Sequence, residues 1–334
     1  MAESLDTSAR EIPYPYAVGS ILRANTTFAV PGLPTPTEQY MRVKQLIEPQ
    51  TLSCCMIVEI LEGPNSPATG TEAFLKLYDW RFATDFRKDF YMDLWSADVE
   101  RKYVEGLPTG RLHEFSQRLR YEKNFRDETE NEWDEAEDEA FLVHEMQKAF
   151  DAEVATYARL AKYQGDVIPH FLGELELDFP LNYPNDTTQE RKYKVKGVLL
   201  ELIPGFSLSD MIKKVRRSSW KGIVDQTIQL TRVLDDNNVE DKYEVYMVGF
   251  AQCRLCGEDE SDLHWGRAKH QQDEEGAVGA IMEMRLEQVG YKLDFKPLWK
   301  YIEWAPGEND EDWAVPYNQN IRDDFALAGH TWLR

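Results

Sequence analysis

Apolar and polar residues alternate in several short segments of the N-terminal part of the chain. A period of two places every second side chain on the same face, which is typical of β-strands. Segments rich in β-branched, aromatic and aliphatic residues predict strands at residues 40–46, 52–61, 72–78, 168–177 and 195–203. The second and third are joined by a segment rich in glycine and proline, so we expect an antiparallel meander there.

One long segment, residues 139–163, has a helical period instead. Its apolar stripe contains one acidic residue, Glu153, between Leu142, Met146, Ala149, Tyr157 and Leu160. An unpaired buried carboxylate costs several kcal/mol, so Glu153 should have a cationic partner. The alternative is that Glu153 lies at the edge of the stripe and reaches solvent.

The rest of the chain is less regular at its start and more helical towards its end. Residues 1–38 are rich in proline, threonine and alanine without a sustained period, and predict an irregular arm. Helical patterns follow at 220–234 and 273–288, with a strand-like pattern at 242–248. Five strands and a helix followed by a mostly helical half predict an α+β fold with two lobes.

Composition and charge narrow the class of function. The chain has 334 residues, 42% of them hydrophobic, and 60 acidic against 38 basic residues give a formal net charge of −22. Nucleic acids and anionic membranes would be repelled, so a protein partner is expected instead. No apolar run reaches the roughly 18 residues of a membrane span, and no secretory signal begins the chain. We therefore expect an intracellular protein, cytoplasmic or nuclear; the pattern does not indicate an oligomeric state.

The four cysteines are Cys54, Cys55, Cys253 and Cys256. They are too few and too unevenly placed for a disulfide framework. The last two have the spacing of a zinc or redox motif, but adjacent cysteines such as the first two seldom bind one tetrahedral ion together. Structural cysteines are the simpler interpretation, a zinc site the other, and we predict no metal site. The acidic segment 127–139 is interpreted as a solvated entry to the following helix, with a dock for a basic partner as the alternative.

The order of these segments resembles a protein kinase fold, more specifically the kinase-like proteins that are expanded in fungi. The segment Phe74-Leu75-Lys76-Leu77-Tyr78 is similar to the strand whose lysine pairs with nucleotide phosphates, and Glu153 matches the helix glutamate of that family. Taken alone, Lys76 would be an exposed strand lysine, but the resemblance implies that it forms an ion pair with Glu153. Residues 199–208 resemble the hinge beside the adenine, with Glu201 and Ile203 as the implied backbone contacts. Gly249-Phe250-Ala251 stands where a kinase has Asp-Phe-Gly.

The resemblance implies a bilobal kinase-like fold, with an antiparallel sheet and a long helix in the first lobe and a small, mostly helical second lobe. The implied boundaries are an arm at 1–38, a first lobe at 39–200 with an insertion at about 79–138, a second lobe at 201–304 and a tail at 305–334. ATP is the implied cofactor, held by Lys76, Glu153, Glu201 and Ile203. Magnesium would accompany it in an active member of the family.

Several departures from the family pattern argue against catalysis. The best match to the catalytic aspartate is Asp241, but no asparagine follows it before Phe250, and few residues separate it from Gly249. Glycine offers no oxygen to magnesium, and phosphoryl transfer depends almost wholly on positioning and charge neutralisation. The glycine-rich lid over the phosphates is also missing.

Three hypotheses follow for the function. The first is a catalytically impaired pseudokinase that acts as a binding or scaffold module, with a residual ATP site. The second is an active ATP-dependent phosphotransferase, acting on a protein or small-molecule hydroxyl, with Asp241 as the base and other carboxylates as metal ligands. The third is that a segment of about ten residues is missing after Asp241, which would restore the length of the loop but not the aspartate at position 249.

Overall fold

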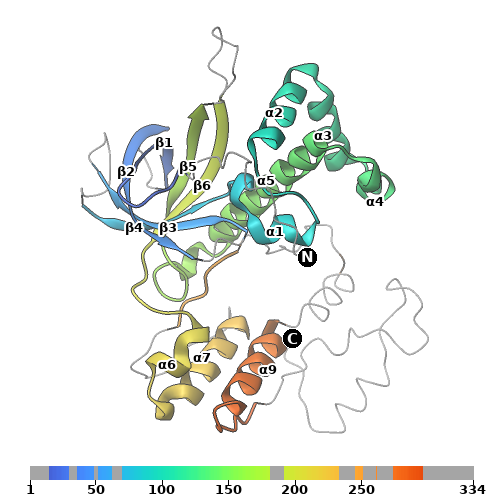
Figure 1. The fold of residues 1–334 in the computed structure, drawn as a ribbon. Helices are drawn as coiled ribbons and strands as arrows, with labels where there is room; N and C mark the ends of the chain where they lie inside the picture. Colours follow the sequence, from blue (N-terminus) through green and yellow to red (C-terminus); the bar gives the residue numbers. More distant parts are fainter. Residues whose placement is uncertain are drawn as a thin grey trace, which may run out of the picture. The chain divides into compact units, whose positions relative to one another are not determined.

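Six antiparallel strands form a closed barrel in the computed structural model of this chain, in the order β1-β2-β3-β4-β6-β5 (Figure 1). The structure describes residues 15–29, 36–48, 52–61, 70–180, 192–232, 245–250, 261 and 274–295. The strands are β1 Ile21–Phe28, β2 Thr37–Ile47, β3 Cys54–Ile60, β4 Glu72–Leu77, β5 Phe171–Pro180 and β6 Lys192–Glu201.

The helices of the described residues lie between β4 and β5 and after β6. They are α1 Thr84–Asp89, α2 Ala97–Gly106, α3 Arg111–Tyr121, α4 Phe125–Thr129, α5 Glu135–Arg159, α6 Met211–Lys214, α7 Trp220–Arg232 and α9 Glu274–Glu287. Short 3₁₀ turns join several of them, at Trp80–Phe82, Leu107–Thr109, Glu130–Glu132, Ala161–Tyr163, Leu208–Asp210 and Arg217–Ser219. None of the helices in these ranges is both long and apolar enough to cross a bilayer.

The closed barrel shows that the predicted bilobal kinase-like fold is wrong, because that fold has an open sheet in its first lobe. The difference arises at β1, which lies in the segment predicted to be an irregular arm. This strand pairs with β2 on one side and with β5 on the other, and so joins the two edges of the sheet. Its inward positions are Leu22, Ala24, Thr26 and Phe28. Alanine and threonine weaken the apolar alternation, which is why the pattern did not predict a strand.

A close backbone contact makes this closure of the barrel sensitive to one residue of β5. Gly173 pairs with Phe28 of β1, and a Cβ atom built on Gly173 would lie 2.5 Å from the carbonyl oxygen of Thr27. No real side chain tolerates that distance to the backbone. Glycine is therefore required where β1 and β5 meet.

Helix α5 begins four residues earlier than the apolar stripe predicted. Asp134 is its N-cap, and its carboxylate accepts hydrogen bonds from the backbone N–H groups of Ala136 and Glu137. The Glu137 carboxylate in turn accepts from the backbone N–H of Asp134, which completes a capping box. The acidic segment before the helix thus supplies its N-terminal cap.

Helices α1 to α4 form an insertion between β4 and α5, and α2 and α3 pack against α5 (Figure 1). Aromatic side chains fill much of this contact. Rings of Phe115, Trp133 and Phe141 follow one another at centroid distances of 5.0 and 5.3 Å. Aromatic pairs at these distances add to the stability that burial already supplies.

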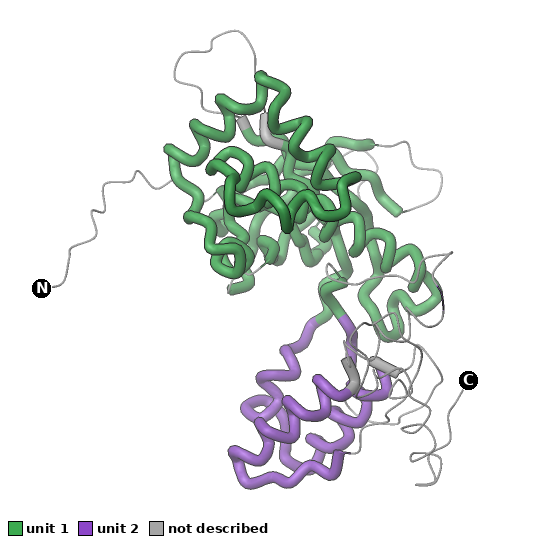
Figure 2. The backbone as a smooth tube through the Cα atoms, turned by 90° about the vertical axis from the view of Figure 1, so that its right-hand side faces the viewer, with its two compact units in different colours: residues 1–203, 248–253 green, residues 204–247, 254–334 purple. Residues whose placement is uncertain are grey.

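The chain divides into two compact units, residues 1–203 with 248–253 and residues 204–247 with 254–334 (Figure 2). The first contains the barrel and α1 to α5. In the second, α6, α7 and α9 share a core in which Met211, Val224 and Leu286 are fully buried. The strand predicted at 242–248 is not formed at residues 245–248, and its first three residues lie outside the described ranges.

Candidate functional site

Lys76 lies on the outer face of the barrel because of the alternation along β4. Ala73, Leu75 and Leu77 are fully buried on the opposite face of that strand. On the neighbouring strand β3, Cys55 pairs with Lys76, and α5 lies beside this part of the barrel. The lysine side chain is only 9% exposed, although lysine is almost never buried unless it is paired.

The partner of Lys76 is Glu153, as predicted. The Nζ atom of Lys76 lies 2.5 Å from Oε2 of Glu153, whose side chain is fully buried. The same oxygen accepts a hydrogen bond from the hydroxyl of Tyr78, two residues further along the chain from Lys76. Burial, followed by the charge of Glu153, raises the pKa of Tyr78, so this hydroxyl keeps its proton and remains a donor. The three side chains tie α5 to the barrel.

Polar atoms on the same face of α5 retain unused capacity for hydrogen bonds. Within the described part of the chain, Oε1 of Glu153, the hydroxyl of Thr156 and the hydroxyl of Tyr157 are buried and have no hydrogen-bond partner. These residues lie at positions i, i+3 and i+4, so they share one side of the helix. Burial and the nearby Glu153 charge raise the pKa of Tyr157. A donor placed beside Oε1 of Glu153 would gain a charge-assisted hydrogen bond.

The segment with Gly249 and Phe250 reaches α5 one turn after Glu153. The ring of Phe250 is buried and packs edge-on against Tyr157, with the centroids 5.2 Å apart. Gly249 has a positive φ of 86°, and a Cβ atom built there would meet no atom within 4 Å. The structure therefore brings this segment near the Lys76–Glu153 pair, but position 249 supplies only backbone atoms.

Two of the other predicted site residues, Glu201 and Ile203, lie at the end of β6 and just after it. Glu201 ends β6, where its backbone N–H donates to the carbonyl of His170 and its carboxylate accepts from the His170 N–H. Ile203 follows it and is half-buried. Asp241, the candidate catalytic base, lies outside the described residues. A role of Lys76, Glu153, Glu201 and Ile203 in binding ATP stays a prediction.

The cysteines and possible metal ligands give no further site in the described ranges. Cys54 and Cys55 form no disulfide there, and burial raises the pKa of the Cys55 thiol. Cys253 and Cys256 lie outside those ranges. No group of three or more histidine, cysteine or acidic side chains suited to a metal ion occurs among the residues that the structure describes.

A second buried ion pair lies on the same helix and was not predicted. Arg87 of α1 donates two hydrogen bonds to Glu139 of α5, at 2.8 and 2.7 Å, and both side chains are buried. Glu139 and Glu153 are 14 residues apart, close to four helical turns, so both carboxylates lie on the buried side of α5. Extending the apolar stripe back by one turn would have revealed Glu139 as a second buried carboxylate.

A third buried cluster links the start of the described chain to the end of β4. The hydroxyl of Tyr16 donates to Asp79 at 2.5 Å, and Arg81 donates two hydrogen bonds to the same carboxylate. The guanidinium of Arg81 also lies 4.7 Å from the ring centroid of Phe179 in β5. These contacts are structural, because every charged group in the cluster is matched by its neighbours.

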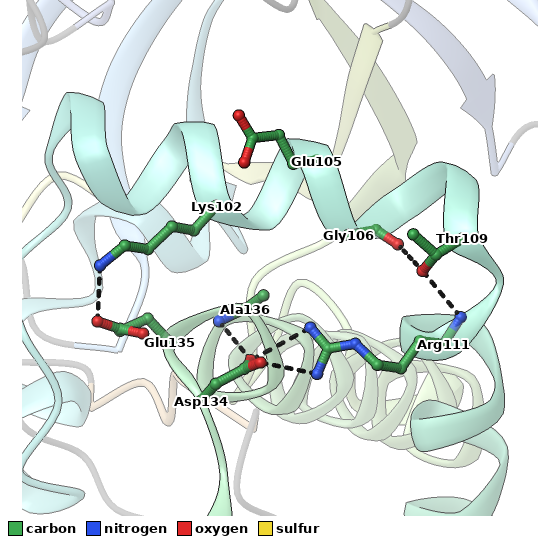
Figure 3. A pocket seen from close by; sticks show the side chains of 8 residues that line it. All are labelled: Lys102, Glu105, Gly106, Thr109, Arg111, Asp134, Glu135 and Ala136. Atoms are coloured by element: carbon green, nitrogen blue, oxygen red, sulfur yellow. Dashed lines mark hydrogen bonds and ion pairs between the residues drawn. The ribbon is translucent and has the colours of Figure 1, made fainter.

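A depression in the helical insertion has a volume of about 300 Å³ (Figure 3). Its lining comes from α2, α3 and the start of α5. Lys102 pairs with Glu135 at 2.7 Å and Arg111 pairs with Asp134 at 2.8 Å across it. The basic groups are thus already neutralised by carboxylates of α5, so the depression offers little attraction to an anion.

A smaller depression of about 190 Å³ lies between α2, α3 and α5, with a mixed polar and apolar lining of Tyr103, Leu107, Leu112, His113, Ser116, Ala140 and Val143. Neither depression is lined by Lys76 or Glu153. In comparisons with known proteins, no protein-family model, no curated protein and no solved structure matches this chain.

Proposed function

We propose that this chain is a non-catalytic binding module that acts through protein contacts. The observation that carries this proposal is the buried cluster of Lys76, Glu153 and Tyr78. The lysine ammonium is held at 2.5 Å by a fully buried carboxylate, and only 9% of its side chain is exposed. The ion pair attaches α5 to the barrel, and this structural role accounts for both charged residues without a catalytic one.

The surroundings of that cluster support the same proposal. Phosphoryl transfer requires charge neutralisation at the phosphates, usually by metal ions held on carboxylate or amide oxygens. The segment that contacts α5 at Tyr157, one turn after Glu153, contributes Gly249, which has no side chain, and Phe250, whose ring packs against Tyr157. An ATP-dependent phosphotransferase with Asp241 as the base is the alternative that the test must separate from the proposal.

The test is thermal unfolding of the full chain with ATP alone and with ATP and magnesium. A ligand that binds the native state stabilises it by RT ln(1 + [L]/Kd), which is about 1 kcal/mol when the ligand is at about five times Kd. That corresponds to a rise in Tm of about 2–4 °C for a unit of this size. At about 5 mM ATP, any site with Kd below about 1 mM would therefore be detected.

We expect no shift under either condition. A magnesium-dependent rise in Tm that is absent in Lys76→Met would contradict the proposal and favour the phosphotransferase. In that case, transfer of label from ATP should be lost in Asp241→Asn. A rise with ATP alone, equal with and without magnesium, would indicate a residual nucleotide site in a protein without the metal-dependent reaction.

A further inference from the structure

Helix α9 is apolar on two opposite sides. Its inner side contributes Met282 and Leu286 to the core shared with α7, where they are 3% and 0% exposed. Its outer side carries four apolar residues that are exposed, Ala277, Ala280, Ile281 and Met284. These four follow at i, i+3, i+4 and i+7, which places them along one face; we call this face the outer stripe.

The outer stripe is unusual for a surface helix, which normally turns polar residues to water. Ile281 is 48% exposed and Met284 is 55% exposed, although both belong to residue types that are usually buried. Single exposed apolar residues need no explanation, but here four exposed apolar residues lie next to one another along one face of the helix. The two alanines are small enough to let another backbone approach closely beside Ile281 and Met284.

The charges beside the outer stripe indicate what can cover it. Glu283 and Glu287 are exposed along one edge, and the chain as a whole carries a formal net charge of −22. A second copy of α9 would bring the same acidic edge against its own carboxylates, which is unfavourable. A helix with an apolar stripe and basic residues on one flank would match both the apolar face and the acidic edge.

We propose that the outer stripe of α9 is the docking surface for an amphipathic helix of a partner protein, with lysine or arginine along one flank. This inference rests on the proposed function as a binding module and adds the chemical class of the partner. Ile281 and Met284 are the central contacts, because they are the largest exposed side chains of the stripe. Glu283 and Glu287 select the basic flank.

The probe is a synthetic helical peptide of about 18 residues, roughly five turns, with leucines at i, i+3, i+4 and i+7 and lysines on one flank only. A second peptide carries glutamates in place of the lysines. Binding of each labelled peptide to the full chain is measured by fluorescence anisotropy. We expect the lysine peptide to bind at least about tenfold more tightly than the glutamate peptide.

The double variant Ile281→Glu with Met284→Glu separates a specific contact from general attraction to an acidic protein. These substitutions add negative charge, so electrostatics alone would strengthen binding of the lysine peptide. We expect binding to weaken at least about tenfold instead. The matched control is Leu94→Glu, which introduces the same residue at another exposed apolar position, 63% exposed, and should leave binding unchanged.

Three results would overturn the proposal: no binding of the lysine peptide, equal binding by the double variant and the original chain, or equal loss in the Leu94 control. A fourth result that would overturn it comes from sedimentation of the chain alone. A dimer that dissociates in the variant Ile281→Glu would identify a second copy of the chain as the occupant of the outer stripe. Each of these leaves the nucleotide titration unaffected, so failure here is distinct from failure of the proposed function.

Discussion

The buried pair between Lys76 and Glu153 makes a quantitative prediction about stability. Lys76→Met keeps the length of the side chain but removes the ammonium, and leaves the fully buried Glu153 carboxylate with only the Tyr78 hydroxyl as a partner. An uncompensated buried charge costs about 3–5 kcal/mol. Since 1 kcal/mol shifts Tm by about 2–4 °C in a unit of this size, the expected decrease in Tm is about 6–20 °C.

The assay is thermal unfolding followed by circular dichroism, with Lys194→Met as the matched control. Lys194 lies on β6 of the same barrel and forms an ion pair of similar length with Glu176, at 2.6 Å, but its side chain is 66% exposed. Exposed pairs contribute about 0–1 kcal/mol, so this control should lose less than about 4 °C. The comparison isolates burial, because the substitution and the ion-pair distance are nearly the same.

A double variant tests the cause of the loss. Adding Glu153→Gln to Lys76→Met removes the orphaned charge while keeping an oxygen that can accept from Tyr78, so most of the stability should return. Equal shifts for Lys76→Met and Lys194→Met would refute the argument from burial. A double variant that is as unstable as the single one would show that lost packing, and not the uncompensated charge, causes the effect.

Three further predictions concern the barrel and α5. Gly173→Val should lower the free energy of unfolding, measured in urea, by about 1–3 kcal/mol, because the new side chain meets the β1 backbone. The control Gly205→Ala, at a position with open space around it, should change that free energy by less than about 0.5 kcal/mol. Equal effects of the two substitutions would contradict the close contact. Arg87→Ala should leave the Glu139 carboxyl without its cation, and burial already raises the pKa of this carboxyl. The variant should therefore regain stability relative to the original chain as pH falls from 7 to 5, because Glu139 becomes neutral. A difference in the free energy of unfolding that stays constant over this range would refute the prediction. Burial, then nearby acidic charges, raise the pKa of Asp138 to about 6, so the folded chain holds this proton more tightly than the unfolded chain and loses stability as pH rises from about 4 to about 6. Asp138→Asn should therefore be more stable by about 1 kcal/mol at pH 7.5 and equal to the original chain near pH 4, measured by urea unfolding at both values; no gain at pH 7.5 would contradict the shift.

Local patterns in the sequence predicted the elements around the candidate site. Alternation indicated β2, β3, β4, β5 and β6, and the helical stripe indicated most of α5. The need of Glu153 for a cation also followed from the sequence, because a carboxylate inside an apolar stripe needs one wherever it lies in the chain, and the resemblance of the segment around Lys76 named that cation. These inferences succeeded because each depends on one segment, or on the cost of one buried charge.

Closure of the barrel depended on the tertiary structure. Pairing of β1 with β5 joins residues about 150 positions apart, and no local period records which edges of a sheet will meet. The inward face of β1 packs into an interior lined by the other strands of the barrel, so alanine and threonine suffice there. Glu139 lies one turn before the predicted stripe, and tertiary packing decided which cation meets it, because Arg87 comes from an inserted helix. The sequence by itself determined which segments bury an apolar face and which charge needs a partner, whereas only the tertiary structure decided which distant surfaces meet, because that choice is made by packing between segments.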